Sequence, residues 1–182
     1  MGSISKAAAS LEEQLAVRRR GTAIVVPEPQ RILYQWADKY KERYRWCLRS
    51  SFQTGNPFGN QLTAIARGVG PLIQGAYAFS GAIAATSDAP FVDIEVIDLF
   101  VLRGAASALA LRDLEPNANS GPPIRAITPY DAGVFMYLRE IGQLPVVSPI
   151  QAYLDLYARG GRDLKQAEHL LNNVIQPRWR NR

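Results

Sequence analysis

The residues best suited to chemistry are two carboxylates and a turn of small residues in the middle of the chain. Ser80 and Gly81 form the turn, and Asp93 and Glu95 follow it after a gap of eleven residues. Side chains two residues apart lie on one face of a β-strand, so this pair could share divalent cations, with Asp131 as a third carboxylate. The same spacing is typical of an amphipathic strand whose polar face lies in water, and both interpretations stay open here.

This arrangement resembles the nucleotidyltransferase pattern, in which a Gly-Ser turn opens a helix over phosphates and alternating carboxylates on the next strand hold Mg²⁺. The turn in this chain has the inverted order Ser-Gly. The resemblance implies a metal-dependent nucleotidyltransferase that uses Ser80, Gly81, Asp93 and Glu95, or a catalytically inactive relative of that fold.

Other catalytic machinery is missing from the sequence. The chain has one histidine, His169, and one cysteine, Cys47, so neither a disulfide within the chain nor a zinc cluster of thiolates can form. No nucleophile elbow accompanies the histidine, and neither a P-loop lysine motif nor G-x-G-x-x-G occurs. We therefore expect a non-enzymatic protein with no cofactor and no bound metal, in a reducing cytoplasm.

Positive charge is concentrated at the two ends of the chain, whose formal net charge is +5. Residues 1–60 hold ten Lys and Arg against five Asp and Glu, residues 61–150 hold five against eight, and residues 151–182 hold six against three. A basic N-terminal third favours a polyanion partner, although a basic surface without a partner gives the same totals. An apolar content of 47% suits a soluble globular protein, and no apolar run is long enough for a membrane segment.

A helix and a basic hairpin are predicted at the start of the chain. Ser3 is a suitable N-cap for an amphipathic helix, and three arginines and a glycine then form a turn between extended segments at 16–19 and 22–26. In a winged helix, such a helix enters the major groove of DNA and such a hairpin rests on phosphates. The alternative is an ordinary helix and hairpin with solvated arginines. The candidate DNA contacts are Lys6, Ser10, Arg18, Arg19 and Arg20.

The C-terminal part has the clearest helix signals. Ser148 begins a capping-box pattern with proline in the first turn, and the paired glycines Gly160 and Gly161 end the helix because they tolerate the left-handed backbone conformation. Asp163 repeats the start signal for a last helix that runs to about Ile175.

In the middle of the chain, a helix is expected after the Pro-Glu-Pro break at residues 27–29, with a buried stripe of Leu33, Trp36, Tyr40 and Tyr44. Further strands are expected over residues 45–53, 77–79, 91–102 and 124–128, helices over 60–68, 80–86 and 105–114, and a helix or strand over 132–138. The fold class is therefore α+β. Residues 1–26 form a partial winged helix-turn-helix, and residues 27–182 form a mixed α/β domain with a small sheet, nucleotidyltransferase-like in one interpretation, that ends in two helices.

In this order the elements resemble the AbiEi family, the antitoxin and transcriptional regulator half of type IV toxin–antitoxin systems. The resembling segments are Pro27–Tyr40, Tyr77–Ala85 with the strand that follows it, and above all Pro145–Leu171. The resemblance implies an N-terminal winged helix that binds operator DNA. It also implies a C-terminal domain that counteracts a nucleotidyltransferase toxin encoded next door, with that toxin or the toxin's target as the protein's partner.

The chain departs from the family because there is no room for two further helices before the predicted recognition helix. We expect a fragment or a shortened member, in which residues 1–20 are mobile, dock on the larger domain, or dock on a second copy to give a homodimer. In the family's terminal motif, capping explains Ser148 and Gly161. Asp155, Arg162 and Glu168 are candidate contacts to a partner protein, with an internal Asp155–Arg162 pair as the alternative for two of them.

Overall fold

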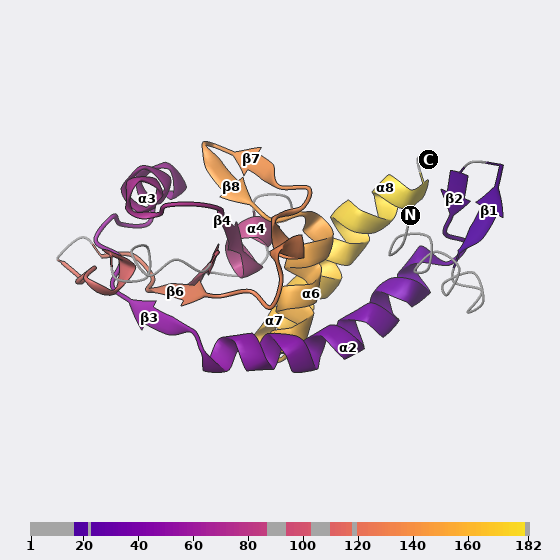
Figure 1. The fold of residues 1–182 in the computed structure, drawn as a ribbon, viewed down its shortest axis with the longest axis horizontal. Coiled ribbons are helices and arrows are strands. Elements are labelled where there is room, and N and C mark those ends of the chain that lie inside the picture. The colour runs from indigo at the N-terminus through magenta and orange to yellow at the C-terminus, as the bar shows by residue number, and fades with distance from the viewer. Residues whose placement is uncertain (1–16, 22, 87–93, 103–109, 118–119, 181–182) are drawn as a thin grey trace.

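The computed structural model describes residues 17–21, 23–86, 94–102, 110–117 and 120–180. These residues form a mixed α+β fold with a two-stranded hairpin, a six-stranded mixed sheet and six α-helices (Figure 1). The predicted helix at the start of the chain, with Lys6 and Ser10, lies outside the described residues. No helix among the described residues is long and apolar enough to cross a membrane.

The strands are β1 (Arg18–Arg20), β2 (Ala23–Val25), β3 (Phe52–Thr54), β4 (Tyr77–Ser80), β5 (Ile97–Val101), β6 (Ile124–Ile127), β7 (Arg139–Ile141) and β8 (Leu144–Val146). The α-helices are α2 (Pro29–Arg49), α3 (Leu62–Val69), α4 (Gly81–Thr86), α6 (Pro149–Arg159), α7 (Arg162–Leu170) and α8 (Gln176–Arg180). Short 3₁₀ segments occupy Gly70–Leu72 and Ala132–Phe135, and a π-helical turn over Leu171–Ile175 joins α7 to α8.

The main sheet has the strand order β3-β6-β5-β4-β8-β7. The pairs β5–β6 and β4–β8 are parallel, and β3–β6, β4–β5 and β7–β8 are antiparallel. All five residues of the central strand β5 are buried. A central strand covered on both faces is continuously buried rather than alternating.

The strand predicted over 91–102 is shorter in the structure than expected. It begins at Ile97, Glu95 lies in a bend before it, and Asp93 lies outside the described residues. The proposed sharing of metal ions by two carboxylates on one strand face is wrong for Glu95, because this residue is not in the strand.

Helix α2 is longer than predicted and replaces most of the strand expected over 45–53. Its buried residues are Leu33, Ala37, Tyr40, Tyr44 and Cys47, which keep the helical spacing of three or four to the last turn. Only Phe52–Thr54 is a strand. The predicted stripe was wrong at one position, since Trp36 is 47% exposed and Ala37 packs in the core instead.

The C-terminal helices confirm the predicted start and stop signals. The Oγ atom of Ser148 accepts a hydrogen bond of 3.2 Å from the backbone N–H of Gln151 and so caps α6. Gly160 and Gly161 have φ values of 71° and 59°, and α7 begins directly after them. The helical segments from α7 to α8 continue to Arg180, beyond the predicted end at 175.

In Figure 1, α2 runs along the lower edge of the molecule beneath α6 and α7, and the β1–β2 hairpin lies at the opposite end of the long axis from α3. Helix α6 packs against α2, α4 and α7, so it connects the long first helix to the sheet. The largest fully buried side chains include Tyr44, Tyr153, Phe79 and Phe100. These aromatic residues come from α2, α6, β4 and β5, which shows that the described helices and the sheet share one core.

Candidate functional site

The first candidate surface is the basic hairpin. Strand β1 pairs with β2 in antiparallel register, Arg18 opposite Val25 and Arg20 opposite Ala23, and Gly21 adopts a positive φ of 65° in the turn. Because side chains alternate along a strand, Arg18 and Arg20 share one face of the hairpin. The pairing confirms the hairpin predicted from the sequence, but the three arginines lie in strand β1 and not in the turn. All three are exposed, so the hairpin presents its charges to solvent.

The basic surface continues along α2. Residues 17–50 contain nine Lys and Arg but only three Asp and Glu. We call the exposed cations of this segment the basic surface: Arg18, Arg19, Arg20, Arg31, Lys39, Arg43, Arg45 and Arg49. Two tryptophans, Trp36 and Trp46, are also exposed on the helix. A helix of 21 residues is about 30 Å long, so these charges follow an extended path.

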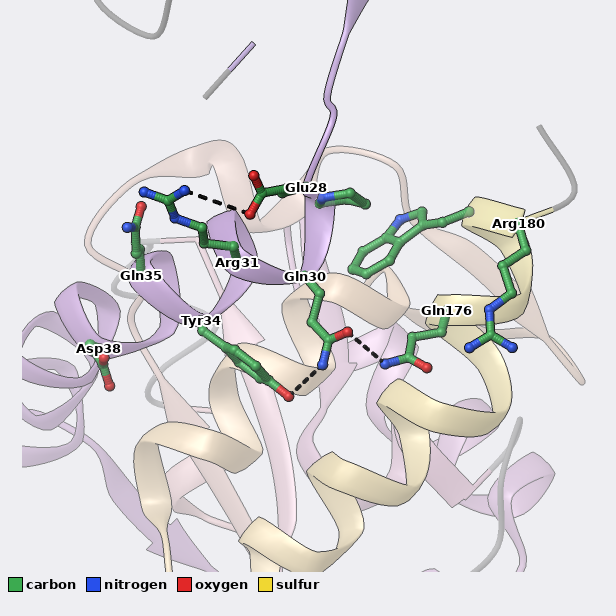
Figure 2. Close-up of a pocket in the computed structure, with 10 residues that line it drawn as sticks. Glu28, Gln30, Arg31, Tyr34, Gln35, Asp38, Gln176 and Arg180 are labelled. Carbon is green, nitrogen blue, oxygen red and sulfur yellow. Dashed lines mark hydrogen bonds and ion pairs between the residues drawn. The ribbon is translucent and has the colours of Figure 1, made fainter. Parts of the chain in front are cut away.

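A groove of about 700 Å³ lies beside this surface, between the first turns of α2 and helix α8 (Figure 2). Gln176 of α8 donates a 3.0 Å hydrogen bond to the side-chain oxygen of Gln30, whose amide nitrogen donates in turn to the Tyr34 hydroxyl at 2.8 Å. Arg31 pairs with Glu28 at 3.6 Å on the rim. The Gln176–Gln30 hydrogen bond joins α8 to the start of α2.

The interior holds a buried carboxylate, Asp155, on α6. Its Oδ1 accepts hydrogen bonds from the Tyr40 hydroxyl at 2.5 Å and from the Gln151 amide at 2.9 Å, and its Oδ2 accepts from the Ser80 hydroxyl. Burial raises the pKa of Asp155 from 3.8 to about 7, although the three hydrogen bonds act in the opposite direction. The cluster ties α2, β4 and α6 together.

A second buried carboxylate, Asp98 on β5, is compensated by two guanidinium groups. Arg125 on β6 contacts its Oδ1 at 2.6 Å through Nη2 and at 2.7 Å through Nε, and Arg159 on α6 contacts its Oδ2. Arg159 also donates to Asp163 at 2.5 Å. Burial alone would lower the pKa of Arg159, but Asp98 and then Asp163 raise it above its ordinary value. This charged cluster is balanced by fixed ion pairs.

The backbone and the space around position 81 require a glycine beside these clusters. It has a positive φ of 57°, and a Cβ atom there would lie 2.6 Å from Oδ2 of Asp98. The Ser80-Gly81 turn therefore serves the interior: the serine hydrogen-bonds Asp155, and the glycine leaves space for Asp98.

The predicted partner contacts fall in different environments. Asp155 is fully buried and has no surface to offer, so the prediction that it contacts a partner is wrong for this structure. The alternative pairing of Asp155 with Arg162 is also wrong, because Arg162 pairs with Glu95 instead. Arg162 and Glu168 are both exposed on α7.

The predicted metal ligands are not brought together in the described part of the chain. Asp131 caps the 3₁₀ segment at Ala132–Phe135 by accepting a 2.6 Å hydrogen bond from the backbone N–H of Gly133. Among the residues that the structure describes, no group of three or more His, Cys, Asp or Glu side chains is placed to hold a metal ion.

Sequence reasoning missed the charged cluster around Asp98. A strand carrying a lone aspartate among apolar residues was one available signal, because a buried carboxylate requires a cationic partner. Arg125 in β6 and Arg159 in α6 gave no comparable signal, since arginines in these contexts are usually solvated.

Comparison of the chain with protein families, with curated proteins and with solved structures finds no match.

Proposed function

We propose that this protein is a DNA-binding regulator and antitoxin of the AbiEi type, and that its described DNA-contacting part is the basic surface of the hairpin and α2. The observation that carries the DNA-binding part is the surplus of six positive charges over residues 17–50, with eight cations exposed. Such a surface attracts the phosphate backbone and releases its counterions.

The geometry suits contact with duplex DNA over an extended length. A helix about 30 Å long nearly equals one turn of B-DNA, which is about 34 Å, so cations along it could follow the phosphates of one groove. Hairpin arginines would add phosphate contacts at one end. These contacts position a protein without reading sequence. In this proposal, base recognition belongs to Lys6 and Ser10, which lie outside the described residues.

The antitoxin part of the proposal rests on the resemblance of residues 27–182 to the family's C-terminal domain. Arg162 and Glu168 are the exposed candidates for contact with a nucleotidyltransferase toxin. We propose no enzymatic activity, because Ser80 hydrogen-bonds the buried Asp155, Gly81 leaves space for Asp98, and Glu95 lies outside the strand on which two carboxylates would share a metal ion.

The test is binding of labelled duplex DNA from the gene's own upstream region, measured by fluorescence anisotropy at several salt concentrations. The full chain is compared with R18A/R20A and with R67A/K165A, which removes the same charge from exposed positions on α3 and α7. The logarithm of the binding constant falls linearly with the logarithm of the salt concentration, and each lost phosphate contact makes this slope shallower by about 0.9. We therefore expect a slope shallower by about 2 for R18A/R20A and little change for the control. Equal slopes in all three proteins would contradict the proposed surface.

A further inference from the structure

A small polar pocket, lined by no residue of the basic surface, lies where the start of α7 meets α4, β6, the end of α6 and the bend before β5. Its volume is about 230 Å³. Three guanidinium groups line it: Arg125 from β6, Arg159 from α6 and Arg162 from α7. The three arginines come from three different elements, and their spacing in the sequence did not predict that they would line one pocket.

Two of these guanidinium groups are held rigidly. The side chains of Arg125 and Arg159 are only 18% and 13% exposed, and both contact the buried carboxylate of Asp98. Asp163 holds Arg159 from a second side. Because these contacts already fix both side chains, a ligand that binds them does not have to order them, which lowers the cost of binding.

Asp98, Asp163 and Glu95 match the three guanidinium groups in formal charge, but the two fixed groups have more N–H donors than these contacts use. A guanidinium group has five N–H donors, and the contacts above engage Nε and Nη2 of Arg125 and Nε and Nη1 of Arg159. The hydrogen bonds and ion pairs to Asp98 and Asp163 in the described structure run through these four nitrogens, and Arg125 Nη1 and Arg159 Nη2 are not among them. Excess donors on fixed cations favour an oxyanion, whose several acceptor oxygens match the fork geometry of arginine.

The mouth of the pocket has an exchangeable pair. Arg162 and Glu95 form an ion pair whose side chains are 71% and 69% exposed. Exposed ion pairs contribute little to stability, so an incoming anion can replace Glu95 as the partner of Arg162 at small cost. The volume of the pocket lies below the range of about 300–1,000 Å³ typical of sites for drug-sized ligands, which limits the ligand to a small group.

We propose that this pocket binds a phosphate group, as inorganic phosphate or as the phosphoryl end of a small metabolite, with Arg125 and Arg159 as its fixed floor and Arg162 as its closing contact. Glu95 competes with the anion for Arg162 and so weakens binding. The proposal is independent of DNA binding, because none of these residues belongs to the basic surface.

The first experiment is calorimetric titration of the full chain with inorganic phosphate at constant ionic strength. Chloride keeps the ionic strength constant and serves as the reference anion. The variants are R162A, E95Q and the control R67A, all at exposed positions where the fold does not depend on the side chain. We expect at least about tenfold weaker binding for R162A, because a charge-assisted contact is lost. For E95Q we expect about two- to fivefold tighter binding, because a competing exposed charge is removed.

A second titration with adenosine monophosphate distinguishes the sources of the phosphate group. Binding of inorganic phosphate alone assigns the pocket to the free ion, and equal or tighter binding of the mononucleotide assigns it to a phosphoryl end. Absence of binding by both ligands would overturn the proposal. So would affinities that R162A and R67A lower equally, because that result reports general charge screening and not this pocket.

Discussion

Replacement of Asp155 by asparagine tests whether the buried carboxyl group controls stability through its protonation. Asparagine has nearly the same shape, and its side-chain oxygen can accept the bonds from Tyr40 and Gln151. Its amide nitrogen can donate to the Ser80 hydroxyl, which can rotate to accept. Asp155→Asn therefore keeps the hydrogen-bond network and removes only the titration.

The sign and size follow from the shifted pKa. Burial raises the pKa of Asp155 from 3.8 to about 7 in the folded protein, so between these values the folded state binds more protons than the unfolded state. The free energy of unfolding therefore falls as the pH rises. The limiting slope is about 1.4 kcal/mol per pH unit, which gives a loss of about 4 kcal/mol between pH 4 and pH 8. The asparagine variant lacks this loss.

The assay is urea denaturation of both proteins at closely spaced pH values from 4 to 8. Other titrating groups are common to the two proteins, so the difference between their unfolding free energies isolates Asp155. We expect the variant to gain about 4 kcal/mol relative to the natural sequence as the pH rises through this range. A difference that stays constant with pH would refute the reasoning, because it would mean that Asp155 has an ordinary pKa in the folded state.

Two further predictions concern the turn of small residues and helix α7. Gly81→Ala should destabilise the fold by more than Gly142→Ala in urea denaturation. Both glycines have a positive φ, of 57° and 56°, which costs about 1–3 kcal/mol for another residue, but only the Cβ at position 81 collides with Asp98. Equal losses would show that the collision is relieved without cost. The antitoxin proposal places a toxin gene beside this one, and on co-expression with that gene Glu168→Ala should lose growth protection while Lys165→Ala keeps it. Protection by both variants would remove Glu168 from the proposed interface.

Elements specified by local signals could be predicted from the sequence. The hairpin at β1 and β2 follows from a glycine between two extended segments, and the cap of α6 follows from Ser148 with proline after it. These signals involve residues within one turn of each other, so no knowledge of the rest of the fold is needed. The β7–β8 hairpin was missed. Both residues of its turn, Gly142 and Gln143, adopt positive φ, and the glycine was the signal for this turn in the sequence.

Elements whose limits depend on packing could not be predicted well. Helix α2 continues to Arg49 because Tyr44 and Cys47 are buried in the shared core, whereas the aromatic and basic residues of that segment also suit a strand. The central strand β5 begins only at Ile97. The prediction of a buried strand within 91–102 is confirmed for Ile97–Val101, and the alternative of a polar face in water is wrong for these five residues, because neighbouring elements cover both faces of the strand.

The candidate site shows the same limit more sharply. The sequence singled out Ser80 and Gly81, yet it could not identify their partners, because the Ser80 hydroxyl meets a carboxylate 75 residues away in the chain. Charge balance at Asp98 likewise depends on Arg159, which is 61 residues away. A pattern can indicate that small residues are needed, but only the fold shows which groups need the space.

The two buried carboxylates are stabilised differently, and only Asp98 shares its partners with the pocket. The side chains that donate hydrogen bonds to Asp155 are neutral, so no cation among them compensates its charge, and protonation neutralises the carboxylate instead. Asp98 is compensated by Arg125 and Arg159, and both of these cations also line the phosphate pocket. A change at Asp98 therefore alters the pocket's floor directly. The residues that line the pocket and pair with Asp98 include no residue of the basic surface, so anion binding and DNA binding should respond to separate sets of substitutions.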